Sequence, residues 1–178
     1  MKLHLGCGSV NLPGFVNVDI ADFPHIDHQQ SVADLAIFAD NSAELIYASH
    51  VLEHFDQFEV KTVLDEWKRV LAPGGILRLA VPDFEQLVAI YHSTQDVGKI
   101  LGYLFGQEKP ARKFTHHKCT YDFRSLQVTL ETAGFVDVKK YDWRKTLHKD
   151  YPDCSQAFYN LDPKNRLFFS LNVECQKP

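Results

Sequence analysis

The sequence predicts an α/β fold with a mainly parallel β-sheet. Short apolar runs of strand length recur along the chain, at residues 2–5, 15–20, 31–37, 44–49, 76–81, 136–141 and 167–175. Between two of them, apolar residues of the stretch 58–71 recur every three or four positions, the stripe of a helix that lies on a sheet. Strands that alternate with helices in this way are typical of the α/β class.

The first half of the chain supplies four of these strands. Residues 2–5 and 15–20 are joined by a link in which Asn11-Leu12-Pro13-Gly14 is turn chemistry. A crossover between parallel strands normally needs about a dozen residues, so this link is short and has room for about one helical turn. A third strand is expected over 31–37, and a fourth over 44–49.

The second half begins with the helix 58–71, which Pro73-Gly74-Gly75 stops. The strand 76–81 is nearly all apolar, as a strand covered on both faces would be. The remaining expected elements are helices 84–91, 97–105 and 123–133, a polar and basic loop 106–120, and strands 136–141 and 167–175. The two late strands, joined through the irregular stretch 142–166, predict an antiparallel edge hairpin.

The composition limits the classes of protein to which the chain can belong. The 178 residues suit one domain, and no apolar run approaches the roughly 20 residues of a membrane helix. The net charge of −4 gives no electrostatic reason to expect a nucleic-acid partner. The four cysteines are widely spaced, which favours free thiols over a zinc knuckle or disulfides. Because the chain begins with a strand and no signal-like segment, we expect a cytoplasmic protein.

Two features predict a nucleoside pocket. The first strand runs directly into Gly6-Cys7-Gly8, a turn whose bare backbone lets a ligand approach closely. The second strand ends in Asp19, where a carboxylate of an open parallel sheet accepts hydrogen bonds from ribose hydroxyls. Neighbouring strand ends would place the turn and the carboxylate together.

Several sequence blocks resemble those of the class I S-adenosylmethionine-dependent methyltransferases, particularly the small type 11-like group. The blocks are Leu5-Gly6-Cys7-Gly8, Leu12-Pro13-Gly14-Phe15 with Asn17-Val18-Asp19-Ile20, Asp40-Asn41-Ser42, Ile46-Tyr47-Ala48-Ser49-His50-Val51-Leu52-Glu53-His54, Trp67-Lys68-Arg69-Val70-Leu71-Ala72-Pro73-Gly74-Gly75 and Ala133-Gly134-Phe135. The resemblance spans almost the whole chain. Two positions depart from it: His4 stands where the family often has an acidic residue, and Val10 where a third glycine is common.

The resemblance implies a Rossmann-like, seven-stranded, mostly parallel sheet with an antiparallel last strand and helices on both faces. We expect residues 1–178 to form one such domain, lacking the family's helices ahead of the first strand, with 83–122 as a substrate-side insertion. The implied cofactor is S-adenosylmethionine. Its implied contacts are Gly6 and Gly8 at the methionine part, Asp19 at the ribose hydroxyls, Asp34 and Leu35 beside the adenine, and Ser49 and His50 beside the sulfonium and the acceptor. Cys7 and Ile20 are also expected among the cofactor-binding residues.

Methyl transfer is an in-line displacement that depends mostly on alignment and a dry site. An acceptor hydroxyl would benefit from a general base, for which histidine is the natural choice. The catalytic candidates are His50, His117 and Tyr121, with a structural hydrogen bond as the alternative for His50 and a solvated loop for the other two. Lys109, Arg112, Lys113 and Lys118 of the basic loop would attract an anionic acceptor, or simply be solvated.

The spacing His50-x-x-Glu53-His54 also admits a metal site, since two histidines at i and i+4 on a helix can share an ion. No third ligand is obvious in the sequence and the family needs no metal. We therefore expect no metal.

The function expected from these features is methyl transfer to O or N of a small acceptor. A saccharide-linked acceptor is suggested by analogy alone. The alternatives are a non-catalytic S-adenosylmethionine-binding module and, less favoured, an NAD-dependent dehydrogenase, for which the Gly6 to Asp19 separation of 13 falls short of the roughly 20 expected. A homodimer is expected if a second copy covers the open cofactor face.

Overall fold

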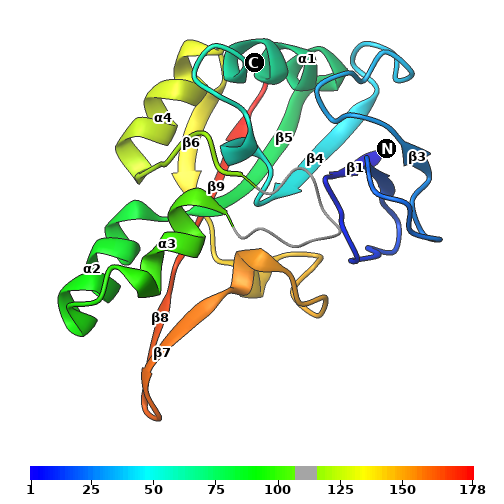
Figure 1. Cartoon of the computed structure of the whole chain (residues 1–178). Coiled ribbons are helices and arrows are strands. Elements are labelled where there is room, and N and C mark those ends of the chain that lie inside the picture. Colours follow the sequence, from blue (N-terminus) through cyan, green and yellow to red (C-terminus); the bar gives the residue numbers. More distant parts are fainter. Residues whose placement is uncertain (107–115) are drawn as a thin grey trace.

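The computed structural model describes residues 1–106 and 116–178, which form an α/β fold around a seven-stranded sheet (Figure 1). The strands run in the order β3-β2-β1-β4-β5-β9-β6. Their bounds are Lys2–Leu5 (β1), Val16–Asp19 (β2), His28–Gln29 (β3), Ala43–Ser49 (β4), Leu71–Pro82 (β5), Val136–Lys140 (β6) and Ser170–Gln176 (β9). β1 to β5 pair in parallel, and β9 is antiparallel to both β5 and β6. The predicted class, strand number and antiparallel last strand are confirmed.

The helices are α1 (Val60–Val70), α2 (Phe84–Thr94), α3 (Gly98–Phe105) and α4 (Phe123–Thr132), with short 3-10 turns η1 (Leu52–His54), η2 (Trp143–Lys145) and η3 (Cys154–Gln156). α1 forms because its apolar stripe is buried, with Trp67 at its centre. α4 begins with a capping box in which Asp122 and Ser125 each accept a backbone N–H of the other. None of the helices in the described ranges has the length and hydropathy needed to cross a bilayer.

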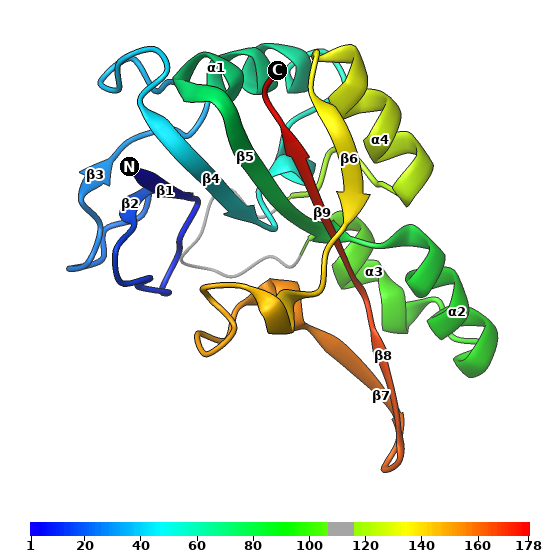
Figure 2. The ribbon, with the colours of Figure 1, turned by 180° about the vertical axis from the view of Figure 1, so that it is seen from behind.

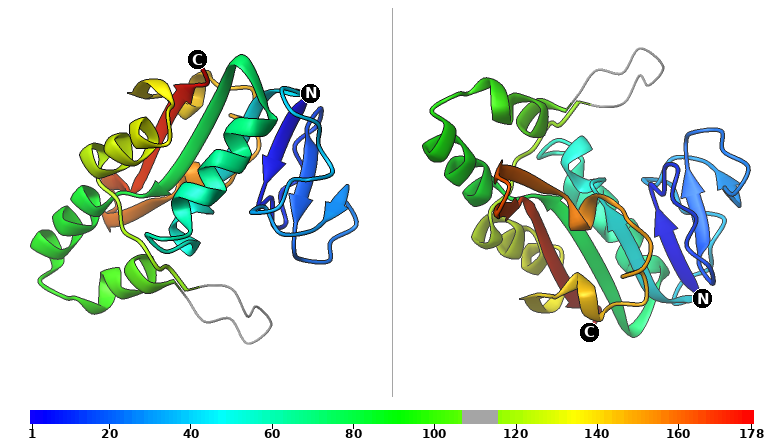
Figure 3. Two further views of the ribbon diagram at one scale, coloured as in Figure 1. Left: turned by 90° about the horizontal axis from the view of Figure 1, so that it is seen from above. Right: turned by 90° about the horizontal axis from the view of Figure 1, so that it is seen from below.

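The main apolar core lies on one face of the sheet. In register across the strands, Leu3, Ile46, Leu77 and Cys175 belong to one buried cluster with the apolar side chains of α1 and α4. Figure 3 shows both helices on the same side of the sheet. The burial of this face accounts for the position of α1 and α4.

The opposite face carries a row of polar side chains. Asn17, His4, Tyr47, Arg78 and Glu174 follow one another across five neighbouring strands. Within the described ranges, no α-helix crosses β4, β5 or β9 on this side (Figure 2). The structure thus corrects the expectation of helices on both faces, whereas β5 is covered on both sides as predicted, with Ala80 on this face 0% exposed.

The segment 142–157 packs on this polar row in place of a helix. Tyr47 donates its hydroxyl hydrogen to Asp153, and the His148 ring stacks on the Tyr47 ring at 4.0 Å between centroids. Arg78 forms an ion pair with Glu174 at 2.8 Å. The His4 ring also stacks on Tyr47, and its Nδ1 lies 3.2 Å from Asn17 Oδ1. Hydrogen bonds and stacking therefore replace apolar contacts on this face.

Buried histidines in this row are expected to make the protein sensitive to acid. Burial lowers the pKa of His4 and of His148 to about 4, from an ordinary 6.5. The unfolded chain therefore binds protons first, so the free energy of unfolding is highest above pH 6.5 and falls as the pH drops towards 4. Each histidine contributes a slope of up to about 1.4 kcal/mol per pH unit.

Urea denaturation between pH 7 and pH 4.5 would measure this slope. His4→Gln should flatten it, because glutamine keeps an amide donor without titrating, whereas His92→Gln, at an exposed histidine, should leave it unchanged. An equal slope in the wild type and in His4→Gln would contradict the account.

Three predicted elements differ from the structure. Residues 31–37 form turns instead of a third strand, and β3 is the two-residue strand before them. Local hydrogen bonds stabilise turns here instead of a strand, because the side chains of Ser31 and Asp34 each accept the backbone N–H of the residue two positions ahead. The predicted strand 167–175 is broken at Phe169 into β8 (Asn165–Phe168) and β9, and the stretch 142–166 contains the unpredicted strand β7 (Phe158–Asp162).

The short link between β1 and β2 contains no helix, although the strands pair in parallel as predicted. Two turns replace the helix, closed by hydrogen bonds from Val10 N to Cys7 O and from Phe15 N to Leu12 O. The strand ends are therefore connected by compact turns alone.

Residues 83–122 begin directly after β5, and the two ends of this segment lie side by side. Asp83 and Tyr121 form an isolated parallel bridge, and Phe84 N donates to Tyr121 O at 2.9 Å. Between them, α2 and α3 pack with the β7–β8 hairpin in a second, smaller apolar cluster, away from the main sheet (Figure 1). Of the basic residues expected in the loop, Lys109, Arg112 and Lys113 lie outside the described residues, and Lys118 pairs with Glu59 at 2.8 Å.

Candidate functional site

The turn after β1 leaves backbone exposed where the first strand ends. Gly6 and Gly8 have φ angles of +64° and +53°, which favour glycine. A Cβ on Gly6 would clash with Val51 Cγ2, whereas a Cβ on Gly8 would meet nothing within 4 Å among the described residues. Packing therefore requires the first glycine, and the second faces open space that a ligand can occupy.

Asp19 ties this turn to the end of β2. Its Oδ2 accepts the Gly8 N–H at 2.7 Å, and its Oδ1 accepts the Ala21 N–H at 2.8 Å. A carboxylate oxygen has two lone pairs, so each oxygen can still accept a hydroxyl hydrogen. The neighbouring Ile20 is 45% exposed and offers an apolar surface beside the carboxylate.

Cys7 lies inside the same turn and is buried. Burial and the nearby Asp19 carboxylate raise the pKa of its thiol to about 12. A protonated, buried thiol is a poor nucleophile, so Cys7 packs in the turn. His25, which the sequence analysis missed, donates its Nε2–H to Gly8 O at 3.0 Å; no sequence pattern links these two residues.

The predicted adenine contacts differ from each other in exposure. Asp34 is exposed, and its Oδ1 accepts the Ala36 N–H at 3.1 Å. Leu35 is fully buried. Its backbone N–H donates to Glu66 and its carbonyl accepts from Arg69, both on α1. Leu35 thus has no exposed surface and no free backbone group for a ligand.

β4 ends in Ser49 and His50. Ser49 Oγ is buried and has no hydrogen-bond partner among the described residues. His50 has a φ of +55° and its Nε2 lies 2.8 Å from Ser170 Oγ, which gives its own hydrogen to Cys154 O. His50 Nε2 therefore donates to Ser170. Burial lowers the pKa of His50 to about 3, so the ring is neutral.

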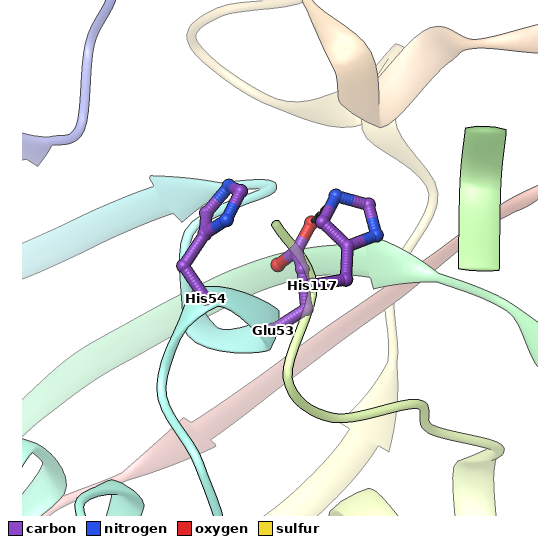
Figure 4. A group of neighbouring side chains, drawn as sticks. All are labelled: Glu53, His54 and His117. Atoms are coloured by element: carbon purple, nitrogen blue, oxygen red, sulfur yellow. Dashed lines mark ion pairs between the residues drawn. The ribbon is translucent and has the colours of Figure 1, made fainter. Parts of the chain in front are cut away.

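The turn η1 follows directly and brings a carboxylate into contact with histidines. Glu53 is fully buried, and its Oε1 lies 3.4 Å from His50 Nδ1 and 3.9 Å from His117 Nε2. Burial raises the pKa of Glu53 to about 8 and lowers that of His117. Figure 4 shows the carboxylate between the rings of His54 and His117. The structure thus joins His50 and His117, which the sequence separates by 67 positions.

Tyr121 completes the predicted acceptor side. It is buried at the bridge to Asp83, and burial raises the pKa of its hydroxyl far above its usual value of 10. Tyr121 therefore stays protonated at neutral pH, able to donate a hydrogen bond but not to take up a proton.

Known proteins resemble the chain both in sequence and in three-dimensional structure. Residues 3–79 match the family model described as "Methyltransferase domain". Solved structures match over 99% of this chain: a SAM-dependent methyltransferase from Archaeoglobus fulgidus (16% identity, 85% of that chain, TM-score 0.58) and one from Thermotoga maritima (15%, 82%, 0.61). A third is the Burkholderia thailandensis 1,6-didemethyltoxoflavin-N1-methyltransferase with bound S-adenosylhomocysteine (15%, 70%, 0.57). No curated protein matches the sequence.

The sheet order and the strand-end site define a protein of the Rossmann-like, nucleoside-binding class. With the family match over residues 3–79, the chain is similar to the class I S-adenosylmethionine-dependent methyltransferases. The methyltransferase-domain match and the similar structures, one of them with bound S-adenosylhomocysteine, support a methyltransferase that uses S-adenosylmethionine. The recognition drawn from the sequence blocks is confirmed.

Proposed function

We propose that the chain transfers the methyl group of S-adenosylmethionine to an oxygen or nitrogen atom of a small acceptor. The observation that carries this proposal is the pairing of Gly8 and Asp19 at neighbouring strand ends, joined by a 2.7 Å hydrogen bond next to open space. Bare backbone and a carboxylate are the two groups that a nucleoside cofactor needs there. A saccharide-linked acceptor remains an expectation by analogy.

On the cofactor side, each residue has a chemical task. Gly6, Cys7 and Gly8 provide close backbone approach for the methionine part, and Asp19 accepts hydrogen bonds from the ribose while Ile20 supports the base. Asp34 is the exposed adenine-side candidate. Ser49 Oγ, which lacks a described partner, can bind a polar group near the sulfonium. When bound, the sulfonium cofactor supplies the methyl group for an in-line displacement.

On the acceptor side, His50, His117 and Tyr121 are proposed to position the acceptor at the end of β4. None of them offers an ordinary general base: His50 has a pKa of about 3, burial lowers that of His117, and Tyr121 holds its proton. Their role is therefore to orient the acceptor and exclude water. The insertion 83–122 is proposed to cover this side. A cytoplasmic location and a homodimer remain predictions.

The test is product formation from S-adenosylmethionine with a panel of sugars, phenols, amines and carboxylic acids. We expect S-adenosylhomocysteine and one methylated acceptor to appear together by mass spectrometry, and both to form much more slowly with Asp19→Ala when the cofactor is subsaturating. Tight cofactor binding without any methylated product would instead favour a non-catalytic binding module. Thermal protection by NAD, but not by S-adenosylhomocysteine, would favour the dehydrogenase alternative.

A further inference from the structure

The buried carboxylate of Glu53 lacks the partner that its charge needs. The side chain is 0% exposed, and neither oxygen accepts a hydrogen bond from residues 1–106 or 116–178. Buried carboxylates are normally hydrogen-bonded, paired with a charge or bound to a metal. Glu53 therefore requires either a cation or a proton.

The surrounding histidines do not supply a donor. His54 Nδ1 lies 3.0 Å from His116 O, and His117 Nδ1 lies 2.8 Å from Tyr103 O. Since a carbonyl oxygen only accepts, both Nδ1 atoms must carry the hydrogen. In each neutral ring the Nε2 atom is then left with a lone pair.

In His50 the two ring nitrogens have the opposite roles. Its Nε2–H is used by Ser170, so its Nδ1 carries the lone pair and faces Glu53 Oε1 at 3.4 Å. His117 Nε2 faces the same oxygen at 3.9 Å. Lone pairs that point at a carboxylate repel it, so this geometry is unfavourable unless a cation or a proton lies among these atoms.

The arrangement has two properties of a built metal site. One ligand atom from each of Glu53, His54 and His117 lies within 4.8 Å of the others (Figure 4). Both histidines donate their Nδ1–H to a backbone carbonyl, a contact that orients metal-binding imidazoles and leaves the Nε2 lone pair for the ion. Lys118 N and Cys119 N also donate to Glu53 O, at 2.7 and 3.2 Å, and hold the His117 segment against η1.

We propose that Glu53, His54 and His117 bind one divalent transition-metal ion, such as Zn²⁺, Co²⁺ or Mn²⁺, with His50 Nδ1 beside it. Two imidazoles and a carboxylate are a donor set for such ions. Metal–ligand bonds of about 2.0–2.2 Å would require the ligand atoms to move together by less than about 1 Å. The sequence alone supplied no third ligand, because His117 comes from a distant loop.

The ion would also serve the proposed function, on which this step rests. Three protein ligands leave at least one coordination position open, and η1 follows directly after the end of β4. An acceptor oxygen bound there would lose its proton more readily. The metal would thus supply the deprotonation that no histidine here provides alone.

Metal binding can be tested without cofactor or acceptor. The chelator-treated chain is titrated with Zn²⁺ and Co²⁺ by calorimetry, and the Co²⁺ form is examined by visible absorption. We expect one ion per chain, with d–d bands typical of nitrogen and oxygen ligands. Glu53→Gln and His54→Gln should each weaken binding by at least about 100-fold, whereas His92→Gln, at an exposed histidine on α2, should bind like the wild type.

Two results would overturn the proposal. One is the absence of stoichiometric binding by the folded wild type. The other is equal binding by the wild type, Glu53→Gln and His54→Gln, which would mean that a proton, and not a metal, satisfies Glu53. A chain that binds the ion but methylates nothing would support the site and count against the proposed function alone.

Discussion

Asp19→Ala is expected to weaken S-adenosylhomocysteine binding by about 10- to 100-fold, the loss expected when hydrogen bonds to a charged group are removed. The carboxylate would lose its contacts with the ribose, and the Gly8 and Ala21 amides would lose their acceptor. Calorimetry on the wild type and the variant measures the change directly.

Asp27→Asn is the matched control for this variant. Asp27 also fixes a loop by accepting a backbone N–H, from Asn17 at 2.7 Å, but we assign it no contact with the cofactor. Its substitution should lower the melting temperature with little change in affinity. Unchanged affinity in Asp19→Ala, or an equal loss in both variants, would argue against ribose binding by Asp19.

Gly8→Ala is expected to abolish most cofactor binding at a small cost in stability. At φ +53° an alanine costs roughly 1–2 kcal/mol, and its Cβ would meet no atom of residues 1–106 or 116–178 within 4 Å. That Cβ would instead occupy the space proposed for the methionine part of the cofactor. Thermal unfolding and calorimetry together separate the two effects.

Gly14→Ala provides the comparison, because Gly14 has a φ of +79° and, among the described residues, an equally open environment. It lies just before the start of β2, at the opposite end of that strand from Asp19. Both variants should unfold at similar temperatures, and only Gly8→Ala should lose affinity. If Gly8→Ala bound S-adenosylhomocysteine like the wild type, the ligand would not lie on this turn.

The sequence was sufficient to predict the features that depend on a few consecutive residues. A strand that ends in glycines and a strand that ends in Asp19 are both visible in a few consecutive positions, and parallel pairing brings the two ends together. The expected strand over 31–37 was wrong because its apolar residues, such as Val32 and Leu35, are buried from turns and not from a strand. Apolar content alone does not distinguish a buried strand from buried turns.

The polar face of the sheet is visible in the sequence as an alternation of polar and apolar residues, although it was not among the predicted features. His4, Tyr47 and Arg78 each lie between two apolar residues of a strand, which is the alternation of a sheet with one polar side. The Glu53 cluster is a different case. His117 reaches it only through the path of the segment 83–122, and no spacing in the sequence encodes that path.

The most direct test of the central claim is a crystal structure with S-adenosylhomocysteine bound. We expect the adenosyl group across the ends of β1 and β2, with a ribose hydroxyl within hydrogen-bond distance of Asp19 and the amino-acid part over Gly8. A complex in which the ligand binds elsewhere, with Asp19 still facing only the Gly8 and Ala21 amides, would contradict this account.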